Sequence, residues 1–198
     1  MARGMLIVFE GLDQSGKQTQ AELLRDFLVS QGRGVELISF PDYSTAIGKE
    51  IERGLHGGRD YAADVMQLLY VANRYERRPQ IEQWLDRGTA VVCDRYLASS
   101  IAYGEAQGLD AEWLREIQRF LPQPDVTILL DIAPETAARR KAAGRDRYER
   151  DLALLSRVRA SYRRQSSGAG WLPLDGERAP AAVSADIVSA VAPELARR

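Results

Sequence analysis

The stretch GLDQSGKQT, residues 11–19, constrains the fold of this chain more than any other, because it directly follows the apolar run MLIVFE at residues 5–10. It nearly matches the phosphate-binding pattern G-x-x-x-x-G-K-[ST], in which glycines let the backbone curve around an anion and the lysine reaches the β- and γ-phosphates. The last position normally carries a hydroxyl that binds magnesium, but here it is Gln18. The alternative is a chance match in an ordinary strand-turn-helix. Other segments of the chain must distinguish a true phosphate loop from such a match.

Apolar runs and helical periodicity alternate along the rest of the chain. Strands are predicted at residues 5–10, 35–40, 90–94, 126–131 and 171–174. Helices are predicted at residues 18–31, 44–55, 60–87, 111–120, 134–141, 151–165 and 181–195. This alternation predicts an α/β fold, with a five-stranded parallel sheet and helices on both faces. In such sheets, ligands bind beyond the carboxyl ends of the strands.

Length and composition narrow the class of protein. The 198 residues suit one domain, residues 1–198, and the 27 Lys and Arg nearly balance the 28 Asp and Glu, so no overall charge favours nucleic acid or membrane. The single Cys93, within an apolar run, excludes an intrachain disulfide and a cysteine-rich zinc site. With no signal-peptide pattern and no apolar run of about 20 residues, we expect a cytoplasmic protein without nucleic-acid or membrane partners.

The pair Asp94-Arg95 ends the third predicted strand. If that strand lies beside the first, Asp94 faces the phosphate loop and can hold magnesium through water, while Arg95 lies beside the transferred phosphoryl group. The alternative is that Asp94 only caps the following helix.

The basic segment RRKAAGRDR, residues 139–147, follows the fourth predicted strand. Such a run is often only a solvated face. Its position instead favours a lid, around residues 139–150, that brings positive charge to the phosphates after both substrates have bound.

Tyr70 and Arg74 lie four residues apart on the long predicted helix, so they share a face. An aromatic ring beside a guanidinium can stack on a base and donate to its carbonyl. A core tyrosine next to a surface arginine is the simpler alternative.

In combination, these segments resemble the thymidylate kinase family, within the nucleoside-monophosphate kinase group. The matching pieces are, in order, FEGLDQSGKQTQ, FPDYSTAIGKEI, LLYVANRYE, DRYLASSIAYG, LPQPDVTILLDIAPE and GRDRYE, and they span residues 9–149. The resemblance implies a P-loop kinase fold, usually a homodimer. It also implies transfer of the γ-phosphoryl group of ATP to dTMP, with Mg²⁺, giving dTDP and ADP for dTTP biosynthesis.

The resemblance also implies roles for individual residues. Those expected to bind ATP are Gly11, Leu12, Asp13, Gln14, Ser15, Gly16, Lys17, Gln18, Thr19 and Arg139. Those expected to act in catalysis are Lys17, Asp94, Arg95 and Arg145. Those expected to bind dTMP are Asp13, Phe40, Tyr70, Arg74, Arg95, Ser99, Ser100 and Tyr103. Asp94, through water, and the Gln18 amide are the expected magnesium ligands.

Two positions depart from the family pattern. Gln14 occupies a place where some members have an arginine, so the lid must supply that charge, from Arg139, Arg140, Arg145 or Arg147. The dipeptide Asp42-Tyr43 replaces an arginine that commonly binds the acceptor phosphate, which makes Arg95 the main candidate for that contact.

Other functions remain open at this point. Another nucleoside-monophosphate kinase or a deoxynucleoside kinase would share the phosphate loop and the Asp-Arg pair. A non-enzymatic ATP-binding P-loop module would bind nucleotide without turnover. A GTPase is disfavoured, since the chain lacks the N-K-x-D motif.

Overall fold

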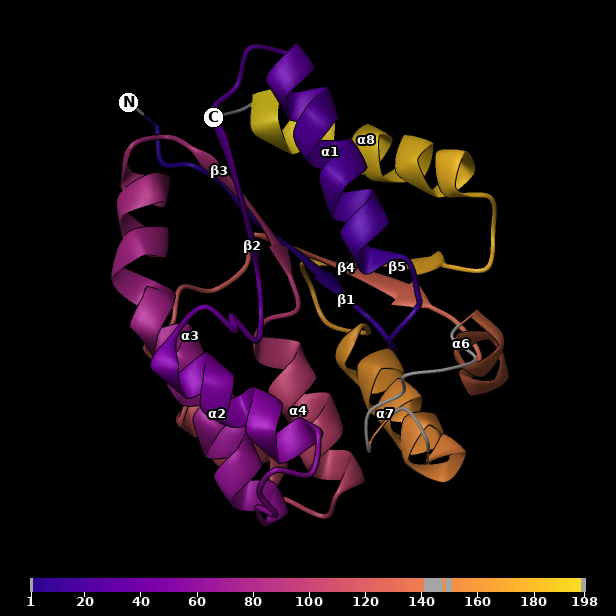
Figure 1. Ribbon diagram of the computed structural model, residues 1–198. Helices are drawn as coiled ribbons and strands as arrows, with labels where there is room; N and C mark the ends of the chain where they lie inside the picture. Colours follow the sequence, from indigo (N-terminus) through magenta and orange to yellow (C-terminus); the bar gives the residue numbers. More distant parts are fainter. Residues whose placement is uncertain (1, 141–147, 149–150, 197–198) are drawn as a thin grey trace.

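A computed structural model describes residues 2–140, 148 and 151–196 (Figure 1). Its strands are β1 (Leu6–Glu10), β2 (Val35–Ser39), β3 (Ala90–Asp94), β4 (Val126–Asp131) and β5 (Trp171–Asp175). Its helices are α1 (Lys17–Ser30), α2 (Ala46–Leu55), α3 (Ala63–Asp86), α4 (Leu97–Ala106), α5 (Ala111–Glu116), α6 (Pro134–Arg140), α7 (Leu152–Gln165) and α8 (Pro180–Ala196). All strand pairs are parallel, in the order β2-β3-β1-β4-β5.

Helices cover both faces of the sheet, as predicted. In Figure 1, α1 and α8 lie above the strands, and α3, α4 and α7 lie below them. The alternating side chains of β1 divide between the two layers. Ile7 and Phe9 pack with residues of α1 and α8, whereas Leu6 and Val8 pack in a cluster that includes residues of α3. Burial on both faces explains why β1 is apolar at every position before Glu10.

The predicted strands and most of the predicted helices are confirmed, with three corrections. Helix α4 was not predicted, because eight of its ten residues are buried and the sequence therefore lacks amphipathic periodicity. Helix α5 ends at Glu116, and turns replace the rest of the helix predicted to reach residue 120. The apolar run of strand β2 predicts burial on both faces, but β2 is an edge strand with partly exposed residues.

The sheet register brings the functional segments together. Strand β3 pairs directly with β1, and Phe9 lies opposite Asp94, so the expected neighbour relationship is confirmed. The phosphate loop follows β1, and Asp94 and Arg95 lie at the end of β3, at the same edge of the sheet. Within the described residues, no helix combines the length and the apolar character that a membrane span needs.

Candidate active site

The loop between β1 and α1 has the backbone of an anion-binding site. Gly11 and Gly16 have φ angles of 140° and 97°, and Gln14 between them has a φ of 63°. A Cβ on Gly11 would lie 2.5 Å from the carbonyl oxygen of Leu130, so this position requires glycine. Since Gly16 has no side chain to cap α1, the first N–H groups of the helix remain available for an anion.

Lys17 begins α1 and points back into this loop. Its side chain is buried, and Nζ donates to the carbonyl oxygen of Leu12 at 2.9 Å. Burial lowers the pKa of Lys17, and the nearby charge of Arg95 lowers it further. A nucleotide phosphate would give this ammonium group a negatively charged partner in place of a neutral carbonyl.

Arg95 follows β3 in the left-handed conformation, with a φ of 64°. Its Nη2 donates to Asp13 Oδ1 at 2.7 Å, and its Nη1 donates to Ser99 Oγ and to the hydroxyl of Tyr162, both at 3.3 Å. Tyr103 also donates to Asp13, at 3.1 Å. Burial raises the pKa of Asp13, but the positive charges of Arg95 and Lys17 outweigh it and hold the pKa well below its usual value. Asp13 therefore stays ionised and fixes the guanidinium of Arg95.

Glu10, at the end of β1, holds side chains around Arg95, a position that the sequence did not reveal. Its carboxylate is fully buried and accepts four hydrogen bonds. Oε1 accepts from the backbone N–H groups of Tyr96 and Ser99, at 2.9 and 3.2 Å. Oε2 accepts from Ser99 Oγ at 2.6 Å and from the Tyr162 hydroxyl at 3.0 Å. Glu10 thus caps the N-terminus of α4 and holds both hydroxyl groups that contact Arg95.

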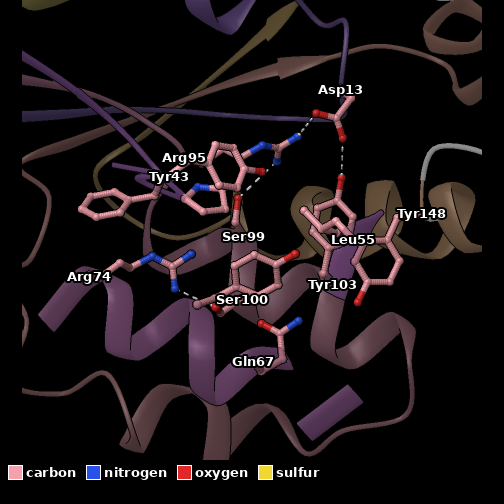
Figure 2. A pocket seen from close by; sticks show the side chains of 13 residues that line it. Asp13, Tyr43, Leu55, Gln67, Arg74, Arg95, Ser99, Ser100, Tyr103 and Tyr148 are labelled. Carbon is pink, nitrogen blue, oxygen red and sulfur yellow. Dashed lines mark hydrogen bonds and ion pairs between the residues drawn. The ribbon is translucent and has the colours of Figure 1, made fainter. Parts of the chain in front are cut away.

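A cavity of about 90 Å³ lies beside this arginine (Figure 2). The eight residues expected to bind dTMP all line it: Asp13, Phe40, Tyr70, Arg74, Arg95, Ser99, Ser100 and Tyr103. The sequence missed five more lining residues: Pro41, Tyr43, Leu55, Gln67 and Tyr148. Tyr148 belongs to the segment GRDRYE, which we interpreted only for its arginines, and its ring packs 5.8 Å from that of Tyr103.

The interpretation of Arg74 as a surface residue is wrong. Its side chain is only 2% exposed, and Nη1 donates to Ser100 Oγ at 2.7 Å and to Gln118 Oε1 at 3.1 Å. Tyr70, on the same helix, lines the cavity beside it. Helix α3 therefore presents both side chains to the cavity, in the arrangement expected for binding a base.

Asp42 does not line the cavity, although its neighbour Tyr43 does. Its carboxylate accepts from Arg77 Nε at 2.6 Å, and its backbone N–H donates to Asn73 Oδ1 at 2.7 Å. These bonds tie the loop after β2 to α3. The residue that departs from the family pattern thus ties the loop to α3 and brings no cation to the cavity, so the expected contact of Arg95 with the acceptor phosphate stays a prediction.

The end of β3 fits a magnesium ion held through water. Asp94 Oδ1 is buried and has no hydrogen-bond partner among the residues described, which is unusual for a carboxylate. The interpretation of Asp94 as a helix cap is not supported, because Glu10 accepts the N–H groups at the start of α4. The Gln18 side chain is exposed and donates from Nε2 to Glu22 at 3.0 Å, so its amide is turned along α1.

The start of the expected lid reaches the phosphate loop. Arg140 donates to the carbonyl oxygens of Gln14 and Gly176, at 2.9 and 3.0 Å. Arg139 donates to Thr136 Oγ1 at 2.7 Å, within α6 itself, so its expected contact with ATP stays a prediction. Arg145 and Arg147 lie outside the described residues, so their expected roles stay predictions.

Comparisons with known proteins agree with this geometry. Residues 9–187 match the model of the thymidylate kinase family. The thymidylate kinase of Schizosaccharomyces pombe is 40% identical over 194 residues, which is 96% of this chain and 92% of that protein. The human thymidylate kinase is 34% identical over 187 residues, 93% of this chain and 88% of the human protein.

A solved structure supports the same assignment. The thymidylate kinase of Candida albicans superposes with a TM-score of 0.84 at 31% identity, covering 98% of this chain and 93% of that one. Asp13 of the phosphate loop and Arg95 both line the cavity between α3 and α4, so the loop and the cavity adjoin. This chain belongs to the thymidylate kinase family.

Proposed function

We propose that this protein transfers the γ-phosphoryl group of ATP to dTMP and releases dTDP and ADP. One observation carries the proposal: the ion pair between Arg95 and Asp13 joins the phosphate loop to the wall of the cavity. A donor phosphate on the loop and an acceptor phosphate at the mouth of the cavity would meet at this guanidinium. The thymidylate kinases that this chain resembles make dTMP the acceptor that the cavity would take.

In this proposal, the reaction is accelerated by positioning the two substrates and by neutralising charge on their phosphates. The second pKa of a phosphate monoester is about 6, so the acceptor oxygen of dTMP is already largely ionised at pH 7 and needs no strong base. Lys17 would hold the β- and γ-phosphates, and Arg95 would neutralise charge on the transferred group. Asp13 and Glu10 contribute by holding Arg95 in place.

Magnesium is the cofactor that fits this site. When bound, Mg²⁺ would neutralise charge on the ATP phosphates. Asp94 would hold the ion through water, since its buried Oδ1 is without a partner in the described part of the chain. The Gln18 amide is the weaker candidate, because its Nε2 already bonds to Glu22.

Three further expectations belong to the same proposal. Residues 1–198 would form one domain whose lid, around residues 139–150, closes over the phosphates. The protein would act as a homodimer, and Val65 and Leu68, 38% and 47% exposed on α3, offer apolar surface for such a contact. It would work in the cytoplasm, where dTTP precursors are needed.

Removing either cation should stop turnover without unfolding the protein. Lys17→Ala and Arg95→Ala are each expected to lower kcat by at least about 100-fold, because single electrostatic contacts to a transition state have effects of this size. Lys49→Ala and Arg119→Ala are matched controls, since both side chains are exposed on the surface. A variant of Lys17 or Arg95 with near-normal kcat would remove that residue from the catalytic set.

A panel of acceptors separates the proposed function from its alternatives. ADP release from ATP would be followed with dTMP, dUMP, dCMP, AMP and thymidine. Preferred turnover of dTMP is expected. Preference for AMP, dCMP or thymidine would indicate a different nucleotide or nucleoside kinase, and ATP binding without turnover of any acceptor would indicate a binding module.

A further inference from the structure

One buried amide fastens the loop after β2, residues 40–45, to α3. Asn73, on α3, is 0% exposed. Its Oδ1 accepts from the backbone N–H of Asp42 at 2.7 Å. Its Nδ2 donates to Thr45 Oγ1 at 2.9 Å, to Glu76 Oε2 at 3.1 Å and to the carbonyl oxygen of Asp42 at 3.3 Å. The side chain of Asn73 therefore holds both backbone polar groups of Asp42.

The same loop is tied to the start of α2. Thr45 is the N-cap of α2, and its Oγ1 accepts from the backbone N–H of Gly48 at 2.9 Å. A Cβ on Gly48 would lie 1.8 Å from the carbonyl oxygen of Asp42, so the loop packs against α2 with no space between them. We therefore expect the loop and the first turn of α2 to shift together when their anchor to α3 is weakened.

This loop carries part of the cavity wall. Phe40, Pro41 and Tyr43 all line the cavity. Asn73 points to the loop and does not line the cavity, whereas the next residue of α3, Arg74, does. Asn73 can therefore act on a bound acceptor only by setting the position of the loop.

Two ties nearer to solvent supplement the buried one. Arg77 Nε donates to Asp42 Oδ2 at 2.6 Å, with the two side chains 31% and 17% exposed. Thr45 Oγ1 donates to Glu76, an exposed residue, at 2.7 Å. Water competes for such contacts and weakens them, whereas a buried amide that loses its partners bears the full cost of desolvation. The position of the loop therefore depends mainly on Asn73.

We propose that Asn73 is a positioning residue for the acceptor, because it holds residues 40–45 where they close one side of the cavity. The inference rests on the proposed function, since it takes dTMP as the acceptor. A loop that spends less time in the binding position raises the apparent dissociation constant in the same proportion. Loosening this loop should therefore raise KM for dTMP and spare KM for ATP, whose phosphate loop follows a different strand.

Reversing the hydrogen bonds of Asn73 tests the assignment. Asn73→Asp keeps the shape but turns an oxygen toward two acceptors, Glu76 Oε2 and the carbonyl oxygen of Asp42. It should raise KM for dTMP by about 10-fold, with KM for ATP within about 2-fold and kcat within about 3-fold of wild type. Adding Glu76→Gln places a donor opposite the new oxygen, so the double variant should recover most of the loss.

Two further variants complete the comparison. Gln83→Glu makes the same change from amide to carboxylate at an exposed position of α3 and should behave as wild type. Asn73→Ala removes the carboxamide without adding a charge, so it serves if Asn73→Asp does not fold, and it should raise KM for dTMP in the same way.

Hydrogen exchange reports on the loop without any turnover. In Asn73→Asp, the backbone amides of residues 42–45 should exchange about 10-fold faster than in wild type, and they should slow again in the double variant. Unchanged exchange of these amides, an equal rise in KM for both substrates, or a double variant no better than Asn73→Asp would overturn the assignment. Failure of wild type to phosphorylate dTMP would instead refute the proposed function, and the exchange rates would still decide whether Asn73 anchors the loop.

Discussion

Replacing Glu10 by glutamine should damage both the stability of the protein and its catalytic arginine. The change preserves shape but replaces one carboxylate oxygen by an NH₂ group. If that group faces the N–H groups of Tyr96 and Ser99, donors oppose donors. If it faces the hydroxyl groups of Ser99 and Tyr162, both of which already accept from Arg95 Nη1, one hydroxyl proton loses its acceptor.

The magnitude follows from the number of bonds affected. Either orientation loses two hydrogen bonds to a buried charge, each worth about 1.5 to 3 kcal/mol, so the free energy of unfolding should fall by about 3 to 6 kcal/mol. For a chain of this length that corresponds to a decrease in Tm of about 10 °C. The negative charge of Glu10 also opposes the lowering of the pKa of Lys17 by burial and by Arg95, so the variant should lower that pKa further.

Urea unfolding at pH 7 and steady-state kinetics with dTMP measure the two effects separately. Because Arg95 loses the hydroxyl groups that position it, kcat should fall by about 10- to 100-fold even at temperatures where the variant is fully folded. Glu52→Gln, on the exposed surface of α2, is the matched control and should change neither quantity. Each lost bond should cost about 1.5 to 3 kcal/mol, so a Glu10→Gln variant whose free energy of unfolding lies within about 1 kcal/mol of the wild-type value would refute this reasoning.

Two further predictions concern the metal and the pH dependence of stability. Gln18→Ser, which restores the usual hydroxyl, should change the apparent Mg²⁺ affinity only modestly; a large gain in activity at limiting Mg²⁺ would show that glutamine handicaps the site. Burial raises the pKa of Asp131, but hydrogen bonds from Arg159, at 2.6 and 3.1 Å, and from Arg163 outweigh it and lower the pKa. The stabilisation is therefore present above the unfolded pKa of about 3.9 and is lost as the pH falls below it. Asp131→Asn should cost about 2 kcal/mol at pH 7, and urea titrations should show the difference from wild type shrinking toward pH 3; a constant difference would contradict this.

The architecture was largely predictable, because local signals specify it. Buried parallel strands are apolar at nearly every position, as β1 and β4 show, and the intervening helices carry amphipathic periodicity. Helix α4 escaped prediction for the opposite reason, since it is enclosed by the protein on all sides. The edge position of β2 depends on sheet order, which no single strand reveals.

The site was predictable where a motif names its residues. The phosphate loop and the Asp94-Arg95 pair could be interpreted locally, and the family resemblance supplied the residues that line the cavity. Glu10 could not be recognised, because its partners Ser99 and Tyr162 are distant in sequence and meet it only in the folded chain. Gln67 could not be recognised as a lining residue either, because a glutamine within a helical pattern does not indicate whether its side chain is buried.

Transfer of labelled phosphate tests the central claim most directly. The purified protein would be incubated with Mg²⁺, dTMP and ATP labelled in the γ-phosphate, and the products would be separated and identified. The proposed function predicts that the label appears in dTDP in proportion to the ADP formed. Label released as inorganic phosphate, or ATP that remains intact in the presence of dTMP, would contradict it.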